Sequence, residues 1–365
     1  MEVGIVGLPN VGKSTTFNVL TRAGGAEVAN YEFCTIEPNV GVVAVPDSRL
    51  DFLFSVYNNG STKYTPAPMK FVDIAGLVAG ASKGEGLGNK FLSHIRQVDA
   101  IAHVVRAFTD PNVARSKGKV DPIGDIEIIE TELMLADLEA ASKAAEKIEK
   151  QAKSGDKEQV KRHGALLKVK ACIEAGRPAA AAGLSEDEKK LVREHSFISM
   201  KPVLYVFNTD EDKISDFERH FPGLIDFIKE RKGRHVVISA KIETEMLELA
   251  EAERAAFIQE LGFDYRGFDE FIKGAYDLLD LITFFTAGEK EVRAWPIPAG
   301  TKAEDAAERI HSDIKRGFIR AEVMKFGDFE RLGTELKVKE AGLMKGEGRD
   351  YVMQDGDVVY FRFNV

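Results

Sequence analysis

Residues 3–14 read Val-Gly-Ile-Val-Gly-Leu-Pro-Asn-Val-Gly-Lys-Ser and indicate how the chain begins to fold. The apolar run over 3–6 predicts a short strand, and the residues from Ser14 to Leu20 predict a helix after the turn. Between them, Gly7 to Ser14 follows the pattern G-x-x-x-x-G-K-[ST], whose glycines let backbone N–H groups surround a phosphate at a helix N-terminus. The sequence therefore predicts a loop in which Lys13 reaches the β- and γ-phosphates of a nucleotide and Ser14 binds Mg²⁺.

Further apolar runs continue this alternation of strands and helices. They are short, contain β-branched or aromatic residues, and cover 40–45, 71–72, 101–105, 203–207 and 235–238. Helix-forming stretches separate them, which is typical of a parallel sheet with helices on both faces. We therefore predict an α/β nucleotide-binding domain with a mostly parallel sheet, formed by residues 1–124 and 197–280.

Residues 125–196 differ in composition, because they are rich in Ala, Glu and Lys and contain few aromatic residues. Glu and Lys stand four apart at 139/143, 146/150 and 149/153, a spacing that supports exposed helices. A break at Ser154-Gly155-Asp156 predicts an inserted antiparallel helical hairpin, either a partner-binding arm or a solvated structural insert. The apolar residues that we expect along its seam are Ile128, Leu135, Leu138 and Ala145.

Residues 281–365 predict a separate α+β domain. Two strands over 281–285 and 292–295 precede a helix over 303–315, and a strand over 358–363 ends the domain. Its basic residues Arg309, His311, Lys315, Arg316 and Arg320 indicate either a contact with an RNA backbone or an ordinary solvated face.

Composition excludes several classes of protein. The chain has 365 residues, 44% hydrophobic and 30% charged, which excludes a disordered or collagen-like protein. A net charge of −9 excludes a globally basic nucleic-acid binder, and no run approaches the ~20 apolar residues of a membrane span. Cys34 and Cys172 have no metal-ligand spacing, and the histidines form no H-x-x-x-H pair. We expect a cytoplasmic protein that does not bind membranes.

A second nucleotide motif, Asp73-Ile74-Ala75-Gly76, ends an apolar strand. An acidic residue there can hold the Mg²⁺ shell through water, and the Gly76 amide can meet the γ-phosphate. Thr35 lies between the two motifs, where a second hydroxyl would reach the metal, so we expect a nucleotide-dependent switch. Leu77 stands where many GTPases carry a water-orienting glutamine, which predicts slow hydrolysis unless another group positions the water.

The motif Asn208-Thr209-Asp210-Glu211 follows the strand over 203–207, in the place of the guanine-reading pattern N-K-x-D. Glu211 is one methylene longer than the aspartate of that pattern, and Thr209 lacks the lysine stem that covers the base. The site therefore accepts or prefers adenine. The segment Ser239-Ala240-Lys241, after the next strand, would complete the base pocket with backbone N–H groups.

These motifs, in this order, resemble the YchF-type Obg-like ATPases, a branch of the translation-factor class of P-loop NTPases. The resemblance covers essentially the whole chain and includes the stretches 7–15, 73–78, 86–91, 103–106, 208–211, 281–288 and 316–323. It implies a Ras-like P-loop domain, a helical arm and a C-terminal TGS domain of the β-grasp type. It also implies an ATPase that tolerates GTP, associates with ribosomes and regulates translation or the stress response.

The resemblance further implies roles for single residues. The phosphates would be held by Asn10, Val11, Gly12, Lys13, Ser14 and Thr15. Mg²⁺ would be bound by Ser14 and Thr35, and the base would meet residues 208–211. Asn10 matches an asparagine that can ligate a stimulating K⁺ ion.

The sequence alone does not identify the catalytic side chain. Some members carry a proposed catalytic histidine after the strand over 101–105, where this chain reads Asn112-Val113-Ala114-Arg115. Arg115 would either stabilise transition-state charge or be a solvated loop residue. Two alternatives to a slow ATPase switch also stay open: a GTP-specific GTPase, and a ribosome- or RNA-binding adaptor in which nucleotide is mainly structural.

Overall fold

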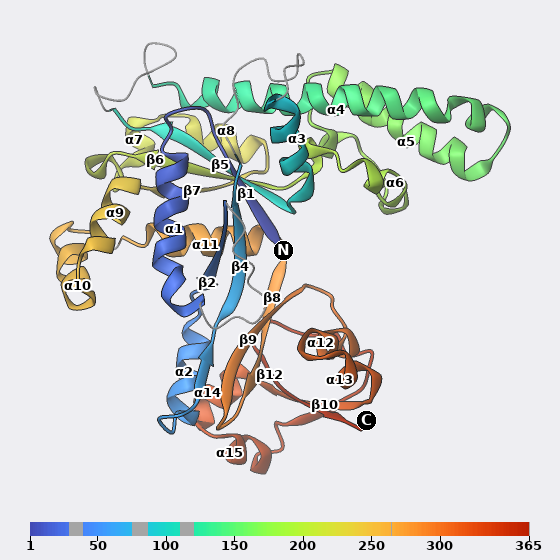
Figure 1. The fold of residues 1–365 in the computed structure, drawn as a ribbon. Helices are drawn as coiled ribbons and strands as arrows, with labels where there is room; N and C mark the ends of the chain where they lie inside the picture. Colours follow the sequence, from blue (N-terminus) through green and yellow to red (C-terminus); the bar gives the residue numbers. More distant parts are fainter. Residues whose placement is uncertain (29–38, 75–86, 110–119, 264, 365) are drawn as a thin grey trace. The chain divides into compact units, whose positions relative to one another are not determined.

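Two β-sheets organise the chain (Figure 1). The structure is a computed structural model that describes residues 1–28, 39–74, 87–109, 120–263 and 265–364. The chain divides into two compact units. The first contains Met1–Ala26 and Lys70–Ala275, and the second contains Val42–Met69 and the chain from Tyr276 to the C-terminal strand.

The first sheet has the strand order β2-β4-β1-β5-β6-β7. Its strands are β1 (Glu2–Val6), β2 (Val40–Val45), β4 (Ala67–Asp73), β5 (Ala100–Ala107), β6 (Val203–Thr209) and β7 (Arg234–Ile238). β1 pairs in parallel with β4 and β5, and β6 pairs in parallel with β5 and β7. The mostly parallel sheet predicted from the sequence is thereby confirmed.

Helices cover both faces of this sheet. On one face, α3 (Leu87–Gln97), α4 (Pro122–Lys153) and α8 (Leu224–Glu230) bury apolar side chains against β1, β5 and β6. On the other face, α11 (Gly267–Leu278) places the ring of Phe271 5.4 Å from that of Phe71. Because both faces are covered, every residue of β5 is buried, as expected for a central parallel strand. The remaining helices of this unit are α1 (Lys13–Val28), α6 (Glu186–Val192), α7 (Phe217–His220), α9 (Ala240–Glu248) and α10 (Glu251–Glu260).

The predicted helical hairpin consists of α4 and α5 (Lys157–Glu174), which lie side by side (Figure 1). Asp121 caps α4 by accepting from Gly124 N at 3.0 Å, and Asp156 caps α5 by accepting from Glu158 N at 2.9 Å. The helices approach each other through small side chains, because Ala141 and Ala145 pack against Ala165 and Leu166. Ion pairs join Glu139 to Lys143 and Glu149 to Lys153, as their spacing predicted.

The predicted seam of the hairpin is confirmed at Ala145 and Leu138, which pack in the core shared with α5, and is wrong at Ile128 and Leu135. Leu135 is 45% exposed, and Ile128 and Leu138 are only half-buried. Most buried positions of α4 lie three or four residues apart, and after Pro122 they are Ile126, Ile129, Leu133, Ala136, Asp137, Ala141 and Ala145. The first three pack against the sheet rather than against α5. One heptad seam cannot describe a helix that changes its packing partner along its length.

The second sheet has the order β11-β10-β12-β8-β9-β3. Its strands are β3 (Lys63–Thr65), β8 (Leu281–Ala287), β9 (Glu291–Pro298), β10 (Phe318–Lys325), β11 (Lys345–Glu347) and β12 (Asp357–Phe363). The helices of this unit are α2 (Ser48–Tyr57), α12 (Ala303–Ile310), α13 (Ser312–Arg316), α14 (Phe326–Leu332) and α15 (Glu335–Glu340). Its core gathers Phe284, Ile297 and Phe361 beneath the alanines of α12.

Two features of this unit differ from the sequence-based expectation. The helix predicted over 303–315 is interrupted at His311, whose backbone is extended and whose Nδ1 accepts from Asp313 N at 3.1 Å. The His311 side chain thus caps the start of α13, where a continuous helix would have a backbone hydrogen bond instead. In addition, β3 pairs with β9, and Arg49 of α2 donates to Asp355 at 2.6 Å, so residues 42–69 build part of the second unit.

The domain boundaries at 124/125, 196/197 and 280/281 stay a prediction. None of the helices described in the structure is long and apolar enough to cross a membrane.

Burial of His103 on β5 yields a stability prediction. Burial lowers the pKa of His103 to about 3, whereas an unfolded histidine titrates near ~6.5. Between these values the unfolded chain binds one more proton, so the free energy of unfolding falls with falling pH by roughly 3–5 kcal/mol. His103→Gln should flatten this slope in urea titrations between about pH 4 and about pH 6.5. The exposed His94 supplies the control, because His94→Gln should keep the wild-type slope. Equal slopes for His103→Gln and wild type would contradict the prediction.

Candidate nucleotide-binding site

The phosphate-binding loop lies between β1 and α1 and has an unusual backbone. Asn10 and Gly12 have φ angles of 63° and 91°, in the left-handed region that turns successive N–H groups toward one side. A Cβ atom on Gly12 would lie 2.3 Å from Nδ2 of Asn208, so the close approach of these two segments requires glycine. The helix begins at Lys13, and Thr16 N donates to Gly12 O at 2.8 Å.

Lys13 and Asp73 form an ion pair at the phosphate end of the site. Lys13 begins α1, and Asp73 ends β4, which pairs with β1 at Ile5. The side chains are 9% and 16% exposed, so each charge is compensated mainly by the other. The lysine expected to meet phosphate and the carboxylate expected to face the metal are thus brought together.

The donors at this end fit Mg²⁺ rather than a softer metal. Ser14 is exposed and the Asp73 carboxylate is paired with Lys13, and the donor atoms of both side chains are hard oxygen atoms. The described part of the chain holds no group of three His, Cys, Asp or Glu residues suited to a metal. A Mg²⁺ ion would therefore depend on phosphate and water for its other ligands, as is usual for this ion. Thr35, Gly76, Leu77 and Arg115 lie outside the described residues.

Asn208 joins the two ends of the site. Its Nδ2 donates to Val11 O at 3.0 Å, and its Oδ1 accepts from Ala240 N at 3.0 Å. The side chain is 5% exposed, so both bonds are shielded from water. One amide at the end of β6 thereby fixes the phosphate-binding loop against the turn that begins α9.

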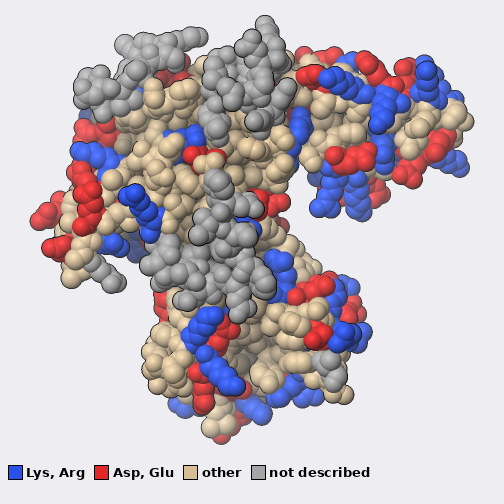
Figure 2. All heavy atoms as spheres, viewed as in Figure 1, with Lys and Arg blue, Asp and Glu red and all other residues tan. Residues whose placement is uncertain are grey.

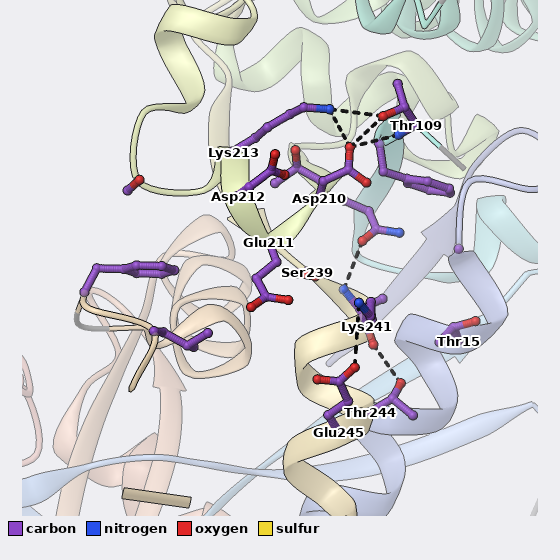
Figure 3. A pocket seen from close by; sticks show the side chains of 18 of the residues that line it. Thr15, Thr109, Asp210, Glu211, Asp212, Lys213, Ser239, Lys241, Thr244 and Glu245 are labelled. Carbon is purple, nitrogen blue, oxygen red and sulfur yellow. Dashed lines mark hydrogen bonds and ion pairs between the residues drawn. The ribbon is translucent and has the colours of Figure 1, made fainter. Parts of the chain in front are cut away.

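The neighbours of Asn208 make different contacts. Thr209 donates its hydroxyl to Ala107 O at 3.1 Å, away from any base. Asp210 accepts from Thr109 N and Oγ1, both at 3.0 Å, and from Lys213 Nζ at 2.5 Å (Figure 3). Burial opposes ionisation of Asp210, but the bonds from Lys213 and Thr109 outweigh it and hold its pKa below the ordinary value. Glu211 is exposed, and its carboxylate makes no hydrogen bond or ion pair with the described residues.

A cavity of about 1320 Å³ unites these segments. The predicted residues that line it are Asn10, Gly12, Thr15, Asn208, Thr209, Glu211, Ser239 and Ala240. Figure 3 shows Glu211 projecting into this space from the segment after β6. The carboxyl ends of β1, β6 and β7 meet at one edge of the sheet, which is where ligands bind in such folds.

Sequence reasoning missed several residues of this cavity. Phe108 directly follows β5, and the rule that ligands bind at the carboxyl ends of strands could have identified it. Thr244 lies on α9, one turn beyond the predicted segment Ser239-Ala240-Lys241, whose Lys241 also lines the cavity. Phe257 and Phe263, on and after α10, belong to no motif, so no signal in the sequence indicated them.

Comparisons with known proteins point to one family. Residues 2–142 match the family model MMR_HSR1, described as 50S ribosome-binding GTPase, and residues 281–364 match YchF-GTPase_C, described as a protein of unknown function. A Bacillus subtilis relative named Ribosome-binding ATPase YchF is 50% identical over 100% of both chains. The protein of that name from Escherichia coli O157:H7 is 49% identical over 100% of this chain and 99% of its own.

Solved structures agree with these matches. The YchF GTPase of Schizosaccharomyces pombe superposes with a TM-score of 0.87 at 36% identity, covering 99% of this chain and 97% of its own. A GTP-binding protein from Pyrococcus horikoshii superposes with a TM-score of 0.63 at 23% identity, covering 100% of both chains. The second likeness concerns the fold alone.

The bridging role of Asn208 can be tested by stability. Asn208→Ala leaves the Val11 carbonyl and the Ala240 amide buried without partners, so we expect the free energy of unfolding to fall by about 2–4 kcal/mol in urea titrations. Asn18→Ala changes an exposed asparagine on α1 and should stay within about 0.5 kcal/mol of wild type. A loss for Asn208→Ala no larger than this control would contradict the role.

Proposed function

The chain belongs to the YchF family of P-loop NTPases, and from this membership we propose that it is a Mg²⁺-dependent ATPase that acts as a slow, nucleotide-controlled switch on the ribosome. The observation that carries the proposal is the single cavity in which Asn208 joins the phosphate-binding loop to the base-facing turn. The names of the relatives support ATP as substrate and the ribosome as partner, which would place the protein in the cytoplasm.

At the phosphate end, Lys13 would leave Asp73 for the β- and γ-phosphates, where its charge stabilises the transferred group. Asp73 would then face the Mg²⁺ shell through water, with Ser14 and Thr35 as direct ligands. The metal, when bound, neutralises charge on the phosphates. The Gly76 amide would contact the γ-phosphate, and Asn10, in its left-handed conformation, would provide a ligand for a stimulating K⁺ ion.

At the base end, the contacts favour adenine over guanine. Guanine recognition needs a carboxylate held toward the N1–H and amino groups of the base. Asp210 is already engaged by Thr109 and Lys213, and no described residue holds Glu211 in place. Thr209 turns its hydroxyl to Ala107 and has no stem to cover the base. We therefore propose that ATP is preferred and GTP tolerated.

Hydrolysis would be slow, because Leu77 cannot orient the attacking water by a hydrogen bond. Arg115 is a candidate for stabilising transition-state charge, and the group that positions the water is left unassigned.

We propose that the C-terminal unit is a TGS domain and that it contacts RNA together with the hairpin. Figure 2 shows basic and acidic side chains interleaved over the hairpin. Lys315, Arg316 and Arg320 are paired with nearby carboxylates, so such a contact would have to displace these partners.

The base preference can be tested by competition between ATP and GTP for a fluorescent ATP analogue, in sodium and in potassium. We expect ATP to compete better than GTP. The double variant Thr209→Lys/Glu211→Asp restores the N-K-x-D pattern and should shift the ratio of affinities toward GTP by about tenfold, or ~1.4 kcal/mol. Glu245→Asp, the same change elsewhere in the cavity, should leave the ratio unchanged. A wild-type preference for GTP would instead support a GTP-specific GTPase.

The switch can be separated from a structural adaptor by single-turnover hydrolysis and by cosedimentation with ribosomes. We expect measurable ATP hydrolysis by wild type and a loss of at least about 100-fold in Lys13→Ala, because the transferred phosphate loses its positive charge. Lys337→Ala, an exposed lysine of α15, is the control and should match wild type. Ribosome binding should differ between ADP and a non-hydrolysable ATP analogue. A wild-type rate equal to that without protein would favour the adaptor.

A further inference from the structure

A buried polar cluster lies behind the base-facing turn. Tyr265 Oη accepts from Ser239 N at 2.9 Å and lies 3.4 Å from Ser239 O. Glu243, on the first turn of α9, hydrogen-bonds Tyr265 and accepts from Phe268 N at 2.9 Å. Tyr265 and Glu243 are 4% and 7% exposed. Neither side chain lines the cavity, so the cluster supports the site from behind.

The cluster satisfies a backbone group that the sheet leaves without a strand partner. β7 ends at Ile238, and the next residue, Ser239, is the N-cap of α9. Its buried N–H group therefore needs a side-chain acceptor, which Tyr265 provides. The adjacent N–H group, that of Ala240, is held by Asn208. Two consecutive amides of the cavity wall are thus fixed by side chains from two different segments.

We infer that Tyr265, supported by Glu243, is a positioning residue that fixes the Ser239–Ala240 backbone against the nucleotide base. The inference rests on the proposed nucleotide function. The cluster holds Ser239, which lines the base end of the cavity, and no hydrogen bond or ion pair among the described residues joins it to Lys13 or Asp73. Its loss should therefore weaken nucleotide binding while the phosphate chemistry continues at its normal rate.

Gly267 offers a second way to disturb the cluster. This residue begins α11, and a Cβ atom on it would lie 2.3 Å from Tyr265 Oη and 2.7 Å from Glu243 Oε1. Gly267→Ala therefore pushes both side chains without removing a hydrogen-bonding group. It should reproduce the effect of removing the tyrosine hydroxyl.

The charge state of Glu243 supplies a further readout. Burial raises its pKa to about 7, against the opposing bonds from Tyr265 and the Phe268 amide, and the charge of Asp269 acts in the same direction as burial. Burial, together with the charges of Glu243 and Glu270, raises the pKa of Tyr265. An ionised Glu243 accepts a hydrogen bond from the Tyr265 hydroxyl, which makes Oη a better acceptor for Ser239 N–H. Nucleotide affinity should therefore rise from about pH 6 to about pH 8, and Glu243→Gln should remove this component. The difference between wild type and variant cancels the titration of the nucleotide.

The decisive comparison is Tyr265→Phe against Tyr205→Phe. Tyr205 is also a buried tyrosine bonded to a glutamate, Glu130, at 2.6 Å, but its hydroxyl bonds no described residue of the cavity wall, whereas Tyr265 bonds Ser239. We expect Tyr265→Phe and Gly267→Ala to raise the Kd for a fluorescent ATP analogue and the KM for ATP about tenfold, with kcat within about twofold. Tyr205→Phe should leave all three constants unchanged.

Several outcomes would overturn the inference. An unchanged Kd in Tyr265→Phe would do so, as would equal losses in Tyr265→Phe and Tyr205→Phe, or a loss confined to kcat. If Tyr265→Phe does not fold, Glu243→Gln decides, and a pH dependence identical to wild type would reject the role. Failure of the wild-type protein to bind ATP or GTP would instead refute the proposed function, independently of the variants.

Discussion

The site depends on the pair of hydrogen bonds made by the Asn208 side chain. A parallel sheet brings the ends of β1, β6 and β7 to one edge, but it does not fix the loops that follow them. Asn208 does so, because its amide donates to the phosphate-binding loop and accepts from the start of α9. The left-handed Gly12 lets Asn208 approach so closely, since any larger residue would collide with the amide. The geometry of the phosphate end is therefore coupled to that of the base end.

The charges of the site are arranged in two separate groups. Lys13 and Asp73 neutralise each other at the phosphate end, whereas Asp210 is neutralised by Lys213 near the base. In the proposed function a bound triphosphate would compete for Lys13 and leave Asp73 to a cation, so nucleotide and metal would each compensate the charge that the other exposes. No such exchange is needed near the base, where Asp210 keeps its partners. On this proposal the phosphate end is the part of the site whose ion pairing would change with the nucleotide.

Local patterns in the sequence predicted the strands, the phosphate-binding loop and the gathering of residues 208–211 and 239–240 at one cavity. These features follow from short apolar runs and from motifs whose chemistry is local. The hairpin seam was right only toward the end of α4, at Leu138 and Ala145, because burial in α4 changes from the sheet to α5 along one helix. Residues 42–69 joined the second unit through the pairing of β3 with β9, a contact between distant residues. Tyr265 and Phe263 were missed for the same reason, since no spacing links them to the motifs they approach.

The hairpin is rooted in the first unit through a buried carboxylate. Asp137 of α4 is fully buried and accepts from Ile198 N, from Ser199 N and from Arg96 of α3, at 2.9, 2.7 and 3.3 Å. Arg96 also donates to Ser196 O at 3.0 Å, so the return segment of the insertion and the end of α3 meet at one point. A buried charge with this many donors is costly to disrupt, because each group left behind would lose its partner without gaining water. The hairpin is therefore an extension of the nucleotide-binding unit, and a macromolecule bound to it would act on a helix whose first turns pack against the central strands.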